Sequence, residues 1–438
     1  MNAATLRLLL RPAPGSAGVV VIPAVAFAVV SALVLTVVGG AQAFWGWTDE
    51  YAMIYQILAA VALVLLVLPL ASLGGAAARL SARRRDERLS TLRLLGVSGF
   101  GVGVVAVVEA TLVAAAGVLA GLLLTIGIAP LVGLIPFRGA PLGSAVMLPP
   151  LLTSAIAIGT VLLATVSAVI GLRRVVISPL GVRTRTTPRA PHWVRALIAV
   201  VVIAAGFAAG RIVPGMGEAI SIITGLVAIF AIGLLVLNLI GPWVLTVGAR
   251  MQLRRAGTPA RLIAARIVLD DAKGAWRQVS GIAMSSFMAV FAGTGVALMN
   301  VIGSENTRTD DLELVTDMRT GLIITLVASF LMVACSVAVT QASDILDQRE
   351  LHRSLHYLGV PADTVDAARR RAVMSPLLVT SIGSALCAAI LIFPLLGIAL
   401  ITAPASLLTI AAVLATGVAL VWIATRLTRP ILLRAFAG

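Results

Sequence analysis

Lysine is nearly absent from this sequence, which contains only Lys273 beside 32 arginines. A nucleotide-binding P-loop requires the pattern Gly-x-x-x-x-Gly-Lys-Ser/Thr, because its lysine contacts the bound phosphates. Lys273 lies in "DDAKGAW" and is followed by glycine, so the sequence has no such loop. We therefore expect that this chain does not hydrolyse ATP and is not an enzyme.

Charged residues are also scarce, at 12% of the chain against roughly a quarter in soluble domains. The two cysteines, Cys335 and Cys387, fall inside apolar runs and are too few for a disulfide framework or a metal cluster. His352 and His356 stand at i and i+4, the spacing of many zinc ligands, but "HRSLH" has no internal acidic residue and no third ligand nearby. We therefore expect no metal and no other cofactor in this chain.

Apolar residues, in contrast, make up 60% of the sequence. A soluble fold of 438 residues could not bury so many. Many runs reach the ~20 residues that cross a bilayer as a helix. The sequence therefore predicts an all-α polytopic membrane protein with ten transmembrane helices. Their expected ranges are 17–39, 53–77, 100–128, 148–171, 196–213, 219–246, 279–302, 318–342, 373–397 and 404–425.

The distribution of charge predicts the orientation of these helices. If both termini are cytoplasmic, the segments on that side contain 29 of the 33 lysine and arginine residues. The positive-inside rule predicts such an asymmetry. The net charge of +15 therefore reports topology, and no soluble domain offers the basic surface that nucleic-acid binding requires. The first apolar run, of 23 residues, is longer than that of a cleavable signal peptide, so we expect an uncleaved helix.

Two polar segments between apolar runs share one outline. They are residues 83–99, "RRRDERLSTLRLLGVSG", and residues 348–363, "QRELHRSLHYLGVPAD". An offset of 263 residues aligns their Leu-Gly-Val motifs and also their glutamates, Glu87 and Glu350. A similar offset of 259 aligns "RLLLRPAPG" near the N-terminus with "RIVLDDAKG". The chain therefore contains an internal repeat.

The repeat predicts the domain organisation. The same order of spans and loops follows each copy, and each half contains an even number of spans. The halves therefore have the same orientation and form parallel repeats about an axis along the membrane normal. We expect two parallel four-helix repeats, in residues 1–185 and 255–438, joined through residues 186–254 by a two-helix hairpin.

Each polar segment has the pattern of an amphipathic helix closed by a glycine. Its leucines recur at helical spacing, and its charged residues lie on other faces. One interpretation is a helix that lies on anionic lipid headgroups, which basic residues favour. Such a helix does not need the glutamate that both copies carry, which favours docking to a protein instead. The candidate docking residues are Arg84, Arg85, Glu87, Leu92, Leu95 and Gly96 in the first copy and Arg349, Glu350, Leu355, Leu358 and Gly359 in the second.

The motif "RDERLSTLRLLGVS" resembles the signature of FtsX-like, MacB-type ABC transporter permeases. "VVEATLVAAAGVLAGLLL" (107–124) and "SPLGVR" (178–183) are also similar to motifs of that family. The resemblance implies a type VII permease architecture in a bacterial plasma membrane. It also implies that both polar segments are coupling helices, each docked on a separate ATPase subunit that binds ATP and magnesium. The second copy departs from the family pattern at His352, His356 and Tyr357, so the two helices are expected to be unequal.

Two functions are consistent with this resemblance. In the first, the chain exports an amphipathic or hydrophobic compound, such as a drug, an antimicrobial peptide or a lipid, through a site between the spans 53–77 and 318–342. In the second, it transports nothing and passes the motion to a membrane partner such as a sensor kinase or a cell-wall enzyme complex. The hairpin at 196–246 either recruits that partner or only links the repeats. The longest outside connection has about 19 residues, so we expect no ectodomain.

Glu109 is a candidate functional residue within the third expected span. An ionisable group inside a membrane is costly and prompts a functional hypothesis. The alternative is a glutamate near the interface that is hydrogen-bonded or paired with a cytoplasmic arginine. At the offset of 263, Glu109 aligns with Ala372, so the second half has no acid at this place.

Overall fold

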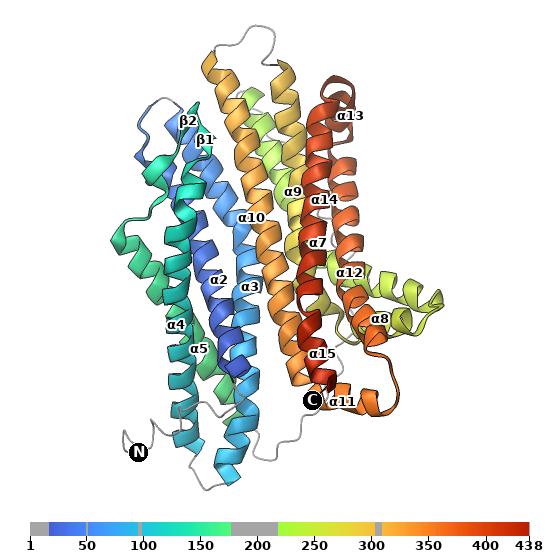
Figure 1. Cartoon of the computed structure of the whole chain (residues 1–438). Coiled ribbons are helices and arrows are strands. Elements are labelled where there is room, and N and C mark those ends of the chain that lie inside the picture. The colour runs from blue at the N-terminus through green and yellow to red at the C-terminus, as the bar shows by residue number, and fades with distance from the viewer. Residues whose placement is uncertain (1–16, 50, 95–98, 177–217, 303–308, 438) are drawn as a thin grey trace. The chain divides into compact units, whose positions relative to one another are not determined.

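The long apolar runs become helices, because lipid offers backbone N–H and C=O groups no hydrogen-bond partners. The computed structural model describes residues 17–49, 51–94, 99–176, 218–302 and 309–437. Its long helices (Figure 1) are α2 (Ala17–Gln42), α3 (Ala52–Leu94), α4 (Gly99–Gly133), α5 (Pro150–Val176), α7 (Glu218–Arg254), α9 (Ala272–Ile302), α10 (Thr309–Asp347), α12 (Ala362–Leu391) and α14 (Pro404–Leu427). The shorter ones are α8 (Pro259–Asp270), α11 (Arg349–Tyr357), α13 (Phe393–Thr402) and α15 (Arg429–Ala437).

Over the residues that the structure describes, eight helices are long and apolar enough to cross a membrane. The chain is therefore an all-helical, multi-pass membrane protein. Nine of the ten predicted ranges coincide with helices, and the other one, 196–213, lies outside the described residues. The range 53–77 falls in α3, where the described side chains define a shorter apolar stretch, Ala52–Val67. The total of ten spans and their arrangement as two repeats stay predictions.

The range 373–397, which we expected to be one helix, contains a break. α12 ends at Leu391, Ile392 has φ −112° and ψ 26°, and α13 begins at Phe393. A proline lies in the first turn of α13. At that position the missing N–H of proline is tolerated, whereas inside a longer helix it would remove a hydrogen bond. The expectation of one continuous helix was therefore wrong, and the proline marks a new helix start.

The described residues cluster into two compact units. The first unit lies within residues 1–186 and 335–352, and the second within residues 187–334 and 353–437. In the first unit, α2 packs most extensively against α4 and also contacts α3 and α5. In the second, α9 packs against α7, α12, α13 and α14. Each unit thus has a central helix that its neighbours surround.

Two glycines allow α2 and α4 to approach closely in the first unit. A Cβ on Gly117 would lie 2.6 Å from the carbonyl oxygen of Ala24, and a Cβ on Gly121 would lie 2.7 Å from that of Ala28. Side chains at these positions would therefore collide with the backbone of α2. This Gly-x-x-x-Gly spacing brings helix backbones together, which increases van der Waals contact in the membrane.

A short hairpin follows α4 at one end of the first unit. Its strands are β1 (Pro136–Phe137) and β2 (Ala140–Pro141), which pair antiparallel. The two turn residues, Arg138 and Gly139, have φ of 54° and 70°. Positive φ at both central residues is the pattern of the type I′ turn, which suits the twist of a two-residue hairpin.

The hairpin directs Arg138 into an aromatic cluster with a counter-ion. Its guanidinium lies 4.2 Å from the ring centre of Trp47 and 4.6 Å from that of Tyr55, and it forms an ion pair with Asp49. Burial lowers the pKa of Arg138, but its hydrogen bonds and Coulombic attraction to Asp49 and Tyr55 outweigh burial and raise that pKa above its ordinary value. The charge of this cation is therefore balanced by a specific anion, Asp49.

The core of the second unit combines large apolar residues on α9 with hydroxyl pairs between helices. Phe287 and Ile282 are fully buried. Neighbouring serines on α9 bond to two other helices: Ser285 to Ser329 of α10, and Ser286 to Ser381 of α12 at 2.8 Å. Such bonds within a membrane protein contribute about 0.6 kcal/mol on average. They fix which faces of the three helices meet.

Candidate functional site

The second polar segment of the repeat forms α11, a short helix between two membrane-length helices. Gln348 separates it from α10. Glu350 lies in its first turn, where a negative charge is stabilised by the helix dipole, and His356 lies in its last turn. The short helix that the sequence predicts here is confirmed.

A Schellman motif ends α11. The N–H of Val360 donates to the carbonyl of Leu355 at 3.0 Å, and the N–H of Gly359 donates to that of His356 at 2.9 Å. Gly359 has a φ of 78°, in the left-handed region that glycine adopts without steric cost. Pro361 then caps the start of α12. The chain thus turns sharply from α11 into α12, as these two residues predict.

Large apolar side chains on α11 and at Leu358, in the turn directly after it, are open to the surroundings. The exposed fraction is 53% for Leu351 and 78% for Leu358, and Leu355 between them is half-buried. These leucines, at i, i+4 and i+7, form a stripe along one face of the helix. Tyr357, on a neighbouring face, is 75% exposed. A contiguous exposed apolar surface of this kind marks an interaction site with protein or membrane.

The two histidines of α11 have different surroundings. His352 is buried, and its Nδ1 donates to the carbonyl of Gln348 at 2.7 Å, whereas His356 is exposed. Within the part of the chain that the structure describes, no group of three or more His, Cys, Asp or Glu side chains could hold a metal ion. Among the described residues, α11 therefore has an exposed apolar face, and its two histidines belong to no group that could hold a metal ion.

An ion-pair cluster connects the start of α12 to the junction of α14 and α15. Asp366 is buried and pairs with Arg369 at 3.3 Å and with Arg370 at 3.1 Å, within one turn of α12. Arg369 also donates to the hydroxyl of Thr428, at the end of α14, at 2.9 Å. Removal of Asp366 would leave two largely buried cations without this anion, which is strongly destabilising in general.

A second contact joins the same elements nearer to the surface. Arg429, the first residue of α15, pairs with Asp363 in the first turn of α12 at 2.9 Å. The side chains are 43% and 82% exposed, so the pair contributes at most about 1 kcal/mol to stability. Together with the buried cluster, it fixes α12 against α14 and α15 directly after the turn from α11.

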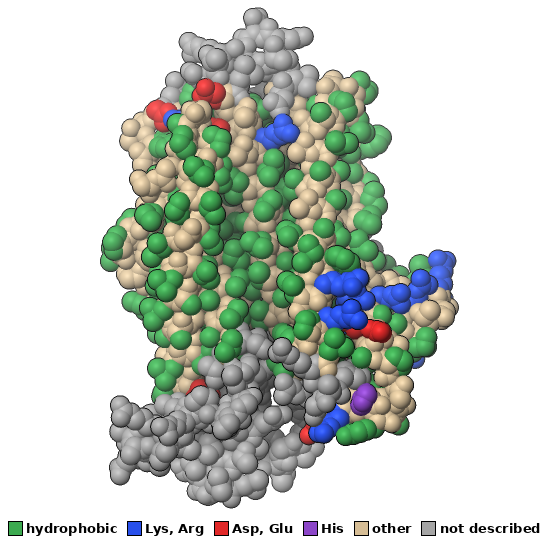
Figure 2. All heavy atoms as spheres, viewed as in Figure 1, with side chains coloured by type: hydrophobic (Ala, Val, Ile, Leu, Met, Phe, Trp, Pro, Cys, Tyr) green, Lys and Arg blue, Asp and Glu red, His purple; other side chains and the backbone are tan. Residues whose placement is uncertain are grey.

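Basic side chains gather at this end of the second unit. Figure 2 shows blue side chains over α8 and the adjoining ends of α7 and α12, whereas apolar side chains cover most of the described surface along the helices. Anionic lipid headgroups and the positive-inside rule both favour such a distribution at a cytoplasmic surface. Exposed arginines here are Arg250, Arg254, Arg255, Arg261 and Arg266.

The first polar segment is built differently from the second. α3 continues without a break to Leu94, whereas we expected a compact helix of its own. No glycine or proline occurs in residues 76–94, so nothing in this stretch stops the helix. Four docking candidates lie on this helix, but the structure does not describe their side chains: Arg84, Arg85, Glu87 and Leu92. The other two, Leu95 and Gly96, lie outside the described residues. Their surface stays a prediction.

Glu109 is the eleventh residue of α4, which begins at Gly99, and its side chain is half-buried. Two residues further, the hydroxyl of Thr111 lies 2.9 Å from that of Thr165 and joins α4 to α5. A functional glutamate within the span and a paired glutamate near the interface both stay predictions.

In the second copy, the structure brings the leucines among the docking candidates together on one face, and Glu350 is exposed. The side chain of Arg349 is not among those that the structure describes. Sequence reasoning missed the cluster around Asp366, although its spacing of three and four residues to Arg369 and Arg370 is a known helix-pairing signal. Comparisons with protein-family models, with curated proteins and with solved structures gave no match.

Proposed function

We propose that this chain is the membrane-spanning permease subunit of an ABC transporter. Separate ATPase subunits, two copies for each chain, bind ATP and magnesium and dock on α11 and on the C-terminal end of α3. The proposal places the chain in a bacterial plasma membrane, with ten spans in two parallel repeats and both termini in the cytoplasm. Its cargo is an amphipathic or hydrophobic compound.

The exposed leucine stripe on α11 is the observation that carries this proposal. Leu351 and Leu358 are exposed, and burial of their apolar surface against a partner would contribute about 25 cal/mol per Å². Glu350 is exposed on the same helix and gives the surface a polar contact that anionic lipid would not favour. An apolar stripe with a carboxylate suits a groove on a protein better than a membrane surface.

The anchorage of α12 supports a mechanical role. A short turn, Leu358 to Val360, and then Pro361 connect α11 to α12. The turn is hydrogen-bonded and contains Gly359 at positive φ, so we expect it to pass a displacement of α11 on to α12. From α12 the cluster of Asp366, Arg369 and Thr428 connects to the end of α14. Closure of the ATPase subunits would therefore tilt membrane helices, and the tilt changes the affinity of a cargo site.

The test is recruitment of an ATPase by variants of α11. We expect Leu358→Asp to reduce co-purification of the proposed ATPase subunit by about tenfold or more, because the carboxylate cannot enter an apolar groove without losing water. Pull-down from membranes and ATPase assays in nanodiscs measure the effect. The chain should still insert and purify in normal yield.

Leu262→Asp is the matched control. Leu262, on α8 of the second unit, is a leucine with 48% exposure that lies outside the docking helix, so this variant should keep full recruitment. Equal recruitment by Leu358→Asp and by the unmodified chain would contradict the proposal. If a membrane protein, and no hydrophobic compound, stimulates the attached ATPase, signalling replaces export as the function.

A further inference from the structure

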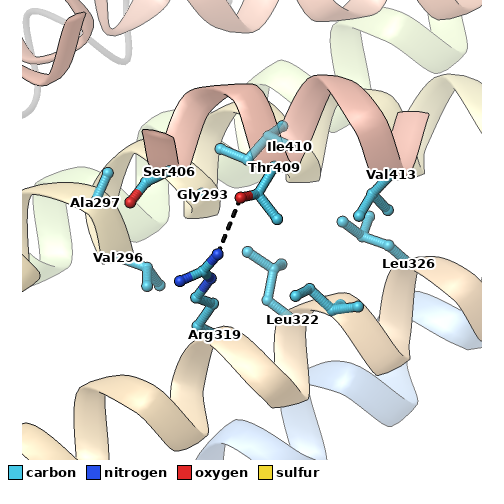
Figure 3. A pocket seen from close by; sticks show the side chains of 11 residues that line it. Gly293, Val296, Ala297, Arg319, Leu322, Leu326, Ser406, Thr409, Ile410 and Val413 are labelled. Carbon is cyan, nitrogen blue, oxygen red and sulfur yellow. Dashed lines mark hydrogen bonds between the residues drawn. The ribbon is translucent and has the colours of Figure 1, made fainter. Parts of the chain in front are cut away.

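A groove lies between α9, α10 and α14 in the second unit. It is an open groove rather than a closed cavity: the space of about 350 Å³ between its side chains includes space open to the surroundings, and most of its lining is apolar. Figure 3 shows Arg319 at one end, with Leu322 and Leu326 following along α10 and Ile410 and Val413 opposite on α14. The groove therefore has one cationic end and one apolar end.

Arg319 has fewer partners than Arg138 of the first unit's hairpin. Its guanidinium donates to the hydroxyl of Thr409 at 2.9 Å, and among the described residues no carboxylate forms an ion pair with it. Arg138, by contrast, has Asp49 and two aromatic rings. A guanidinium carries five N–H donors in a planar fork that fits carboxylates and phosphates. Arg319 thus presents donors for an anion.

The dimensions of the groove suit an amphiphile. From Arg319 to Leu326 the helix rises about 10 Å, enough to line the first part of an alkyl chain. Gly293 contributes to this shape, because a Cβ there would lie 2.3 Å from the Cδ1 of Ile410 and would force that side chain away. The wall of α9 is otherwise made of small residues such as Ala297.

Most of the length of α10 separates Arg319, at the groove, from the start of α11. From Arg319 to the end of α10 at Asp347 the helix extends about 40 Å, close to the full thickness of a bilayer with its headgroups. The first turns of α14, with Ser406 and Thr409, line the groove, and Thr428, to which Arg369 donates, follows the last residue of this helix. A movement at the docking end can therefore reach the groove through α14.

We propose that this groove binds an amphiphile with a single anionic headgroup, which Arg319 and Thr409 hold while the alkyl chain lies against Leu322, Leu326 and Ile410. That this amphiphile is the cargo rests on the function proposed above. The site differs from the one expected from the sequence, because it pairs α10 with α9 and α14. Charge complementarity identifies the occupant: the exposed guanidinium of Arg319 forms no ion pair with a carboxylate of the described residues, and an anionic headgroup supplies the charge that a neutral lipid lacks.

The test is a binding titration of the full chain in phosphatidylcholine nanodiscs, without any ATPase. The probe is 11-(dansylamino)undecanoic acid, and its neutral amide is the comparison. We expect saturable binding of the acid and at least about tenfold weaker binding of the amide. Arg319→Gln should weaken binding of the acid by the same factor, because a hydrogen bond between two charged groups is lost. Arg319→Lys should retain most of the affinity, and Val296→Trp should abolish it by filling the groove.

Thr416→Val is the matched control, because Thr416 lies on α14 outside the groove and donates only to the carbonyl of Ala412 at 2.8 Å. Equal affinity for acid and amide, or unchanged affinity in Arg319→Gln, would overturn the proposal. Loss of probe binding when phosphatidylglycerol replaces phosphatidylcholine would also overturn it, because the groove would then hold bulk anionic lipid. If the acid binds but does not stimulate an attached ATPase, the proposed groove is supported and export is contradicted. If the acid stimulates the ATPase without binding in the groove, only the groove proposal is contradicted.

Discussion

Individual arginines show how this chain holds cations with few charged residues available. Arg138 lies between aromatic rings beside Asp49, and Arg369 lies between Asp366 and Thr428. Each is compensated by a specific anion, as the cost of transferring a charge out of water requires. Arg319 is exposed, and within the described part of the chain its guanidinium donates to the hydroxyl of Thr409 and pairs with no carboxylate. The proposed anionic ligand would supply that charge.

Single glycines determine helix packing in the first unit. We expect Gly121→Ala to lower the free energy of unfolding by about 1–3 kcal/mol, because its Cβ would lie 2.7 Å from the backbone oxygen of Ala28 and α2 would have to move. Thermal unfolding of the purified chain in detergent measures the change. Gly127→Ala, on the same helix but with no atom within 4 Å of the new Cβ, should be neutral or stabilising. Equal unfolding temperatures for the two variants would contradict the packing described here.

At the scale of elements, the two polar segments of the repeat have the same sequence outline but different backbones. The second is a separate helix that ends in a Schellman motif, and the first is a continuation of α3 as far as Leu94. The internal alignment of the two copies predicts the position of each segment. It does not predict whether the preceding helix ends before the segment or continues into it. The copies therefore present their candidate docking residues on unequal supports.

Gly359 should be required for the geometry of α11. In Gly359→Val the backbone has to hold a β-branched residue at positive φ, which costs about 1–2 kcal/mol, so we expect the last turn of α11 to open more often. Hydrogen–deuterium exchange at residues 355–360 should become several-fold faster. Gly359→Asn should exchange almost as the unmodified chain does, since asparagine also occupies this conformation. Unchanged exchange in the valine variant would show that the turn does not depend on glycine.

The sequence predicted the helices better than it predicted the contacts between them. Apolar runs and Gly359 each carry a local signal, so the spans and the end of α11 were found. The bond between Arg369 and Thr428 joins residues 59 positions apart, and the bond between Arg319 and Thr409 joins residues 90 apart. Such pairs depend on how helices pack, which the pattern of one helix does not contain. The groove beside Arg319 could therefore not be found from sequence.

At the scale of the whole molecule, the chain is a multi-pass membrane protein whose described residues form two compact units. In the second unit, basic residues gather at the end that includes α8 and the start of α12, and the groove lies near the opposite ends of α10 and α14. The proposed function needs a docking surface for the ATPase at one membrane face, and the proposed ligand site lies toward the other. It also needs both polar segments to face the cytoplasm, which is the central claim of the proposal.

The most direct test of this central claim is labelling of single cysteines with a membrane-impermeant maleimide. The background replaces Cys335 and Cys387 by alanine, and Leu92→Cys, Leu358→Cys and Ser144→Cys are introduced one at a time. We predict that intact cells label only Ser144→Cys, which is exposed in the short 3-10 helix Gly143–Val146 after β2. Inverted vesicles should label the other two cysteines until an added ATPase protects them. Labelling of Leu92→Cys or Leu358→Cys from outside, or labelling that the ATPase does not reduce, would contradict the account.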